Sequence, residues 1–123
     1  MTRHDETIDW SRLAGLQEEI GPEEFAAVVE VFLADTDALV AELPQTPPGG
    51  LEAALHAIKG SALNLGLAQL AALCADGEMR AAGGRLQEVA LAPILLAYGE
   101  ARRALVRGLS QGRPNAADRP VRR

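Results

Sequence analysis

The sequence predicts an all-α protein, folded as an antiparallel four-helix bundle with a short additional N-terminal helix. Three observations lead to this prediction. Alanine and leucine dominate the 123 residues, aromatic residues make up only 3%, and β-branched residues never alternate over a long run. Apolar residues recur at intervals of three and four in several stretches. Short segments rich in glycine or proline separate these stretches, which suits antiparallel neighbours.

The first two helices are predicted before and after a Gly-Pro break at residues 21–22. Asp9 is expected to N-cap a short helix that ends near Ile20. Pro22 suits the first turn of a long second helix that runs to about Leu43. Residues 44–50 contain three prolines and two glycines and are predicted to be a connection.

The third helix is predicted from Leu51 to about Leu65, because one apolar stripe runs along it: Leu51, Leu55, Ile58, Ala62 and Leu65. A tight turn at Gly66 then leads to a fourth helix from about Leu67 to Ala82. Both helices are long enough to contribute to a bundle core.

The last helix lies between Leu86 and Leu109, and Pro93 leaves two readings of its course. Pro93 either kinks one continuous helix or stands in the first turn of a helix that starts near Leu91. We favour the continuous helix with a bend. Residues 1–110 would form the bundle, and residues 111–123, with two prolines and several arginines, would form a disordered basic tail.

Composition excludes several functional classes. The net charge is −5, with −10 on residues 1–55 and +5 on residues 56–123, so binding to nucleic acid is not expected. One cysteine and two histidines argue against a metal site. The longest apolar run, residues 89–98, is too short to span a membrane, and the polar N-terminus is no signal peptide. We therefore expect a cytoplasmic monomer.

His56 is the candidate reactive residue. On the helical wheel it lies roughly 140° from the centre of the apolar stripe, so it faces water or a partner. Lys59, the only lysine of the chain, is one turn further along. Gly60 leaves a bare patch of backbone beside His56, where another surface can approach, although a glycine inside a helix costs about 0.5–1 kcal/mol.

This pattern resembles the histidine-containing phosphotransfer (HPt) family. Members of that family have a phosphorylatable histidine and a lysine three residues after it. A glycine and then a serine directly follow the lysine, and a second glycine stands ten residues after the histidine. Here these positions are His56, Lys59, Gly60, Ser61 and Gly66. The resemblance implies a phosphohistidine at His56 with Lys59 stabilising the phosphoryl charge, and it extends from about residue 8 to about residue 109.

The resemblance also exposes one departure. On the fourth helix the family usually has a leucine directly before a glutamate, whereas here Gly77 precedes Glu78. We expect this glycine to weaken the helix and loosen its packing, without effect on the phosphotransfer site.

A neutral imidazole is a good nucleophile near neutral pH. The chain has no glycine-rich ATP loop and no carboxylate cluster for Mg²⁺ near His56, so it would have no kinase or ATPase activity of its own. By resemblance, partners are response-regulator receiver domains or a hybrid histidine kinase, and the receiver supplies Mg²⁺. The expected docking residues are Glu52, Gly60, Ser61, Leu63, Asn64 and Leu67. The alternative function is a non-catalytic adaptor that docks to a receiver without phosphoryl transfer.

Overall fold

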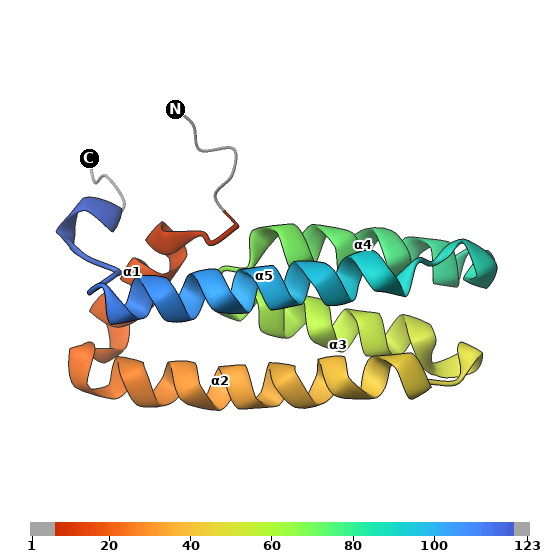
Figure 1. Ribbon diagram of the computed structural model, residues 1–123, viewed down its shortest axis with the longest axis horizontal. Helices are drawn as coiled ribbons and strands as arrows, with labels where there is room; N and C mark the ends of the chain where they lie inside the picture. The colour runs from red at the N-terminus through yellow and green to blue at the C-terminus, as the bar shows by residue number, and fades with distance from the viewer. Residues whose placement is uncertain (1–6, 120–123) are drawn as a thin grey trace.

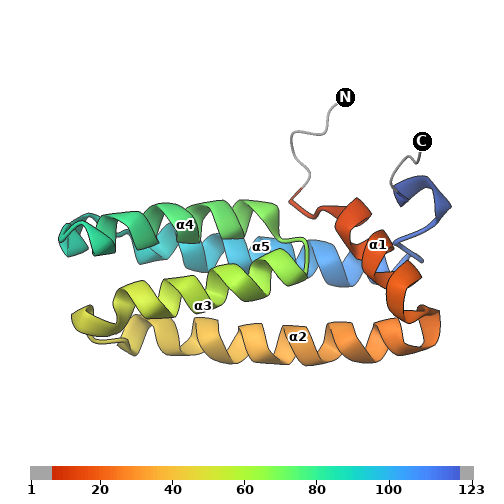
Figure 2. The ribbon, with the colours of Figure 1, turned by 180° about the vertical axis from the view of Figure 1, so that it is seen from behind.

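The computed structural model describes residues 7–119, and these contain five α-helices and no strand. Helices α2 (Pro22–Glu42), α3 (Leu51–Asn64), α4 (Ala68–Ala82) and α5 (Leu91–Ser110) run along one another as an antiparallel bundle (Figure 1). Helix α1 (Trp10–Ile20) packs across the end where α2 and α5 extend past the shorter pair α3 and α4 (Figure 2). The predicted fold class is confirmed.

The capping chemistry explains the start of the chain. The Asp9 carboxylate accepts a hydrogen bond from the backbone N–H of Arg12 at 3.1 Å, as an N-cap does. Gly21 then takes φ +91°, a conformation that other residues rarely adopt, and Pro22 opens α2. A short connection of two 3-10 turns, η2 (Leu43–Gln45) and η3 (Pro48–Gly50), joins α2 to α3.

Gly66 joins the bundle to the N-terminal segment. It has φ +71°, and its carbonyl accepts a hydrogen bond from the Asp9 backbone N–H at 2.7 Å. A Cβ at this position would lie only 2.8 Å from the Asp9 carbonyl oxygen. A glycine is therefore required both for the turn between α3 and α4 and for the close approach of the segment that leads into α1.

The course of the last helix differs from the expected one. A continuous helix from Leu86 is wrong: residues 86–88 form a separate 3-10 turn (η4), and α5 begins at Leu91. Pro93 stands in the first turn of α5, where the missing N–H has no intrahelical partner to lose. The second alternative for Pro93, a helix that starts near Leu91, is therefore correct.

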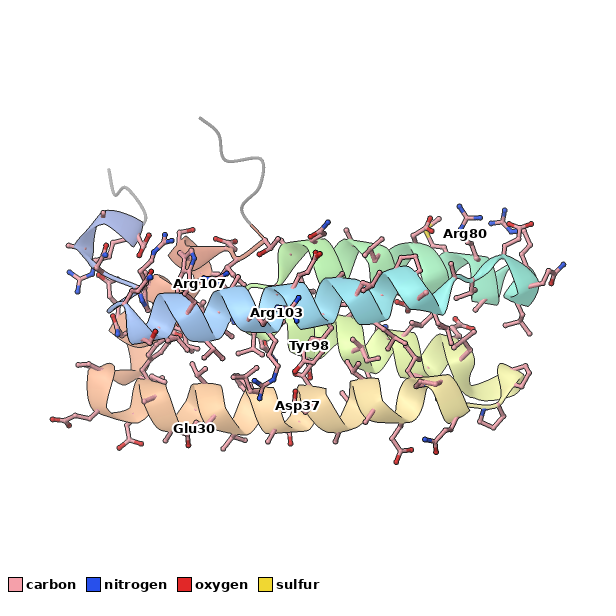
Figure 3. All side chains as sticks on the ribbon, viewed as in Figure 1. Glu30, Asp37, Arg80, Tyr98, Arg103 and Arg107 are labelled. Carbon is pink, nitrogen blue, oxygen red and sulfur yellow. The ribbon has the colours of Figure 1, made fainter. Side chains whose placement is uncertain are left out.

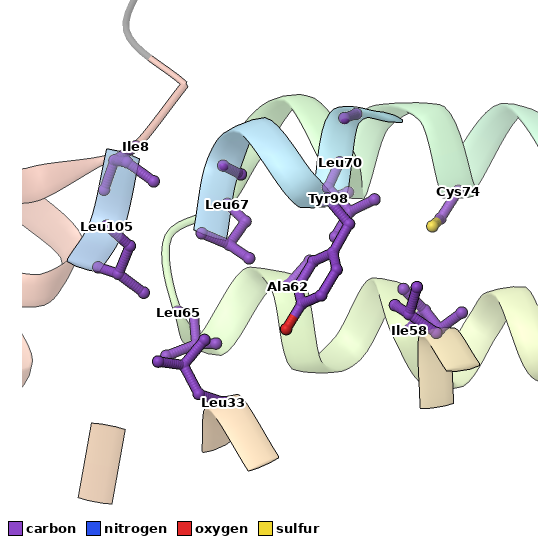
Figure 4. Close-up of a cluster of buried hydrophobic side chains, with 14 of the residues drawn as sticks. Ile8, Leu33, Ile58, Ala62, Leu65, Leu67, Leu70, Cys74, Tyr98 and Leu105 are labelled. Carbon is purple, nitrogen blue, oxygen red and sulfur yellow. The ribbon is translucent and has the colours of Figure 1, made fainter. Parts of the chain in front are cut away.

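The core is a single apolar cluster to which every α-helix contributes. Figure 4 shows part of it, with Tyr98, Leu70 and Ala62 among the labelled side chains. Gly77 belongs to this packing, because a Cβ there would lie 3.0 Å from Leu55 Cδ1 and 3.4 Å from Val89 Cγ1. The expectation that Gly77 loosens the packing is wrong, since neighbouring side chains occupy the space that a side chain would have filled.

Residues 111–119 contact α1 in the structure, in the segment that the sequence analysis expects to begin a disordered tail. The Arg113 guanidinium lies 4.5 Å above the Trp10 ring, and the Asp118 carboxylate pairs with it. Asn115 caps the 3-10 turn η5 (Ala116–Asp118), and Arg119 reaches Glu18 on α1 at 3.4 Å. The local sequence, which is polar and contains proline, does not predict these contacts with α1. Residues 1–6 and 120–123 lie outside the described part of the chain.

An interhelix ion pair connects α2 to α5. The Arg102 guanidinium donates two hydrogen bonds to the Asp37 carboxylate, both at 2.9 Å, and the Tyr98 hydroxyl donates to the same carboxylate (Figure 3). Arg102, followed by Tyr98, holds the pKa of Asp37 below its ordinary value despite partial desolvation. Within residues 7–119, no helix is long and apolar enough to cross a bilayer.

Candidate functional site

The site is built on α3, which buries one side and exposes the other. Leu55 and Ile58 are fully buried, whereas the His56 side chain between them keeps 68% of its surface exposed. This follows from the helical period, because a residue next to the apolar stripe in sequence is turned away from it by about 100°. His56 is thus held by a rigid, packed helix and still open to solvent.

Glu78 of α4 contacts His56 of α3 at the surface of the bundle. The Glu78 Oε2 atom lies 2.8 Å from His56 Nδ1, and Oε1 lies 2.9 Å from the Lys59 Nζ atom. Oε1 is buried, and its contact with Lys59 is an ion pair and not a well-aligned hydrogen bond. One carboxylate therefore connects the imidazole to the ammonium group one turn away.

The charge state of Glu78 determines the tautomer of His56. Lys59, followed by His56, holds the pKa of the Glu78 carboxyl below its ordinary value against the opposing effect of desolvation. An ionised carboxylate can only accept hydrogen bonds, so in their contact the His56 Nδ1 must carry the hydrogen. In the neutral ring, Nε2 then has the lone pair.

Open space lies over Gly60, one helical turn from His56. Gly60 is exposed, and a Cβ built on it would meet nothing within 4 Å. Two large apolar side chains, Leu63 of α3 and Met79 of α4, are 55% and 69% exposed. A polar centre with exposed apolar side chains on the same two helices is typical of a transient protein interface.

The other predicted docking residues are dispersed. Glu52 is exposed in the first turn of α3, Ser61 is half-buried toward α2, and Asn64 is exposed at the end of the helix. Leu67 was expected on the docking surface, and this is wrong, because its side chain is fully buried in the core. The Gly66 turn ends α3 before Leu67, so the helical wheel that placed it outside no longer applies.

Glu78 is the site residue that sequence reasoning missed. It was noted only as part of a family pattern, because its role depends on how α3 and α4 are aligned. The close packing of these helices at Gly77 and Leu55, one residue from each partner, brings Glu78 and His56 together. No group of three or more His, Cys, Asp or Glu side chains in residues 7–119 is placed to hold a metal ion.

Comparison with known families shows which family the chain belongs to. The family model described as "Hpt domain" matches residues 27–112, well over half of the chain. The chain belongs to the Hpt domain family. No curated protein and no solved structure is significantly similar to it. Hpt domains act in phosphotransfer within two-component signalling and interact with receiver domains of response regulators or hybrid kinases.

Proposed function

We propose that this Hpt domain is a phosphorelay intermediate in which His56 carries the phosphoryl group. His56 Nε2 attacks the phosphorus of an aspartyl phosphate on a receiver domain. The N–P bond forms, the P–O bond to the aspartate breaks, and the aspartate leaves as a carboxylate. In the next step the aspartate of another receiver attacks the same phosphorus and releases the imidazole.

The observation that carries this proposal is the contact between His56 Nδ1 and Glu78 at 2.8 Å. It directs the Nε2 lone pair to the exposed side of the ring. Attack by Nε2 leaves a positive charge on the imidazole, and the Glu78 carboxylate is already in place to stabilise it. Phosphoryl transfer depends mostly on such positioning and on charge stabilisation.

Lys59 supplies a positive charge, opposite to the negative charge of the Glu78 carboxylate. Its ammonium group, held 2.9 Å from Glu78 Oε1, stands one helical turn from His56. In the proposed reaction it stabilises negative charge on the phosphoryl oxygens. The receiver brings the aspartyl phosphate and its Mg²⁺, because the sequence contains neither an ATP-binding glycine loop nor a carboxylate cluster at His56.

A labelling experiment tests the proposal. The protein is mixed with a panel of receiver domains carrying radiolabelled aspartyl phosphate, in the presence of Mg²⁺. We expect an acid-labile, base-stable phosphate on the wild type and none on His56→Gln, whose circular dichroism stays helical. Label retained by His56→Gln would place the phosphate elsewhere. Binding of receivers without any labelling would instead favour the non-catalytic adaptor.

A further inference from the structure

The connection between α4 and α5, residues 83–90, lies at the end of the bundle opposite α1 (Figure 1). Its backbone folds back on α4, because the Arg85 N–H donates a hydrogen bond to the Arg80 carbonyl at 2.8 Å. Further along, the Val89 N–H donates to the Leu86 carbonyl at 3.1 Å. Backbone hydrogen bonds therefore fix the course of the connection up to Val89.

Ion pairs on the surface hold the same segment against α4. The Arg80 guanidinium donates to the Asp76 carboxylate at 2.9 Å and to the Glu88 carboxylate at 3.0 Å. Arg85 approaches Glu88 at 3.6 Å. Exposed ion pairs each contribute little to stability, but Glu88 directly precedes Val89, so these contacts add to the backbone hydrogen bonds at that point of the chain.

Val89 occupies the space that α4 leaves open at Gly77. A Cβ built on Gly77 would lie 3.0 Å from Leu55 Cδ1, 3.4 Å from Val89 Cγ1 and 3.9 Å from Ile94 Cδ1. Side chains from α3, from the connection and from α5 thus converge on one position of α4 that has no side chain. Of these three, Val89 alone comes from a segment that is not an α-helix.

Gly77 stands next to the site in the chain. Glu78 directly follows it on α4, and its neighbour Leu55 directly precedes His56 on α3. A glycine leaves the backbone of a helix freer than other residues do, so packed neighbours have to limit its motion. Leu55 does this from α3 and Val89 from the connection. Without the Val89 methyl groups, a space would remain into which the backbone of α4 can shift.

We propose that Val89 is a positioning residue for phosphoryl transfer: packed at Gly77, it holds α4 at the distance from α3 at which Glu78 contacts His56. The inference rests on the proposed function of His56 and adds a residue that acts through Glu78. The contact to be held is 2.8 Å between Glu78 Oε2 and His56 Nδ1, and hydrogen bonds of this kind require a narrow range of distances. A small shift of α4 therefore weakens the preference of the ring for the hydrogen on Nδ1.

The test compares two substitutions of the same chemistry. Val89→Ala removes two methyl groups at Gly77. Val29→Ala removes the same two groups from the core of α2, where Val29 lies near Val106 of α5 and is only 2% exposed. Because Val29 is more deeply buried, this control should lose at least as much stability. For each protein we measure the ¹⁵N chemical shifts of His56 and its rate of labelling by phosphoramidate, a small donor that needs no receiver.

We expect Val89→Ala to lower the share of the His56 tautomer with hydrogen on Nδ1 and to slow labelling by about 5-fold, since small misplacements of reacting groups have large effects on rate. Val29→Ala should keep the wild-type shifts and stay within about 2-fold of the wild-type rate, because distant sites act independently. In a Glu78→Ala background, Val89→Ala should change neither quantity further, because the contact that it positions is already lost.

Val89→Ile is the conservative variant. It keeps the branched side chain at Gly77, and a surface hollow of about 310 Å³, lined by Val89, Gly77 and Pro93 among others, leaves room for the extra methyl group. We expect wild-type ¹⁵N shifts and a wild-type labelling rate from Val89→Ile. Circular dichroism checks that all these variants stay helical.

Three results would overturn the inference. Unchanged ¹⁵N shifts in Val89→Ala would mean that Val89 does not hold the Glu78 contact, and equal losses in Val29→Ala would indicate a general effect of core stability. A further loss of labelling in the Glu78→Ala background would mean that Val89 acts by another route. In all three cases the assignment of His56 would stand. Absence of label on wild-type His56 would instead remove the proposed function, whereas the ¹⁵N shifts test the Glu78 contact without any phosphoryl transfer.

Discussion

Two carboxylates connect neighbouring helices of this bundle in a similar way. Glu78 of α4 contacts His56 and Lys59 of α3, and Asp37 of α2 contacts Tyr98 and Arg102 of α5. Each carboxylate pairs with one basic side chain and with one ring that bears an ionisable hydrogen. In each case the basic partner is the main cause of a lowered carboxyl pKa.

The two clusters differ in what surrounds the ring. Tyr98 is only 6% exposed, and burial, followed by Asp37, raises its pKa so that the phenol keeps its hydrogen. The His56 side chain is exposed, and within residues 7–119 its second ring nitrogen has no hydrogen bond. A hydrogen-bonded carboxylate therefore holds two helices together when its ring is buried, and can prepare a nucleophile when the ring is exposed.

The largest effect is expected from closing the space beside His56. Gly60→Glu places a large, negatively charged side chain in the open space beside His56, where the aspartyl phosphate of a receiver approaches in the proposed function. We expect transfer from the receiver to fall by about 100-fold, since small misplacements of reacting groups have effects of this size. The measurement is the single-turnover rate of label transfer, with phosphoramidate labelling alongside it.

Gly60→Ala is the matched control. A methyl group there meets no neighbour within 4 Å, so the helix should gain about 0.5–1 kcal/mol in unfolding free energy while transfer stays near the wild-type rate. A loss of helical signal in Gly60→Glu would mean that the glycine serves folding and not access to His56.

An intermediate effect is expected at Glu78. Glu78→Gln keeps a hydrogen-bond acceptor for Nδ1 but removes the charge that, in the proposed function, stabilises the phosphorylated ring. We expect labelling of His56 to slow by about 10-fold, which corresponds to about 1.4 kcal/mol in the barrier. The ¹⁵N chemical shifts of the imidazole should also show a smaller share of the tautomer with hydrogen on Nδ1. Unchanged shifts together with an unchanged rate would contradict this role.

The smallest effect on transfer is expected at Asp37. Because its pKa is lowered in the folded protein, its contribution to stability is present above the pKa of an unfolded carboxyl, about 4, and is lost as the pH falls through the folded value. Asp37→Asn should therefore lower the unfolding free energy by about 1 kcal/mol at pH 7 and by much less near pH 2.

Urea unfolding at several pH values measures this effect, and the transfer rate of Asp37→Asn at pH 7 should match that of the wild type. A loss of transfer equal to that in Glu78→Gln would show that the Asp37 cluster and the Glu78 cluster do not differ in function.

Much of this fold was predictable from local signals. The apolar stripe of α3, the break at Gly21-Pro22 and the Asp9 cap each depend on neighbours within one or two helical turns. The predictions of an exposed Leu67 and of a continuous helix through Pro93 were wrong because each residue stands at a helix boundary. At a boundary, a shift of one residue turns a side chain by about 100°.

The amino-acid sequence predicts a helical bundle with His56, Lys59 and Gly60 on one outer face, because helical period and motif spacing are properties of a single segment. The contact between Glu78 and His56, the close α3–α4 packing at Gly77 and the groove that Asp35 and Glu42 line between α2 and α3 appear only in the tertiary structure. These features depend on the alignment of helices far apart in sequence. Packing of the whole core sets that alignment, and no local pattern encodes it.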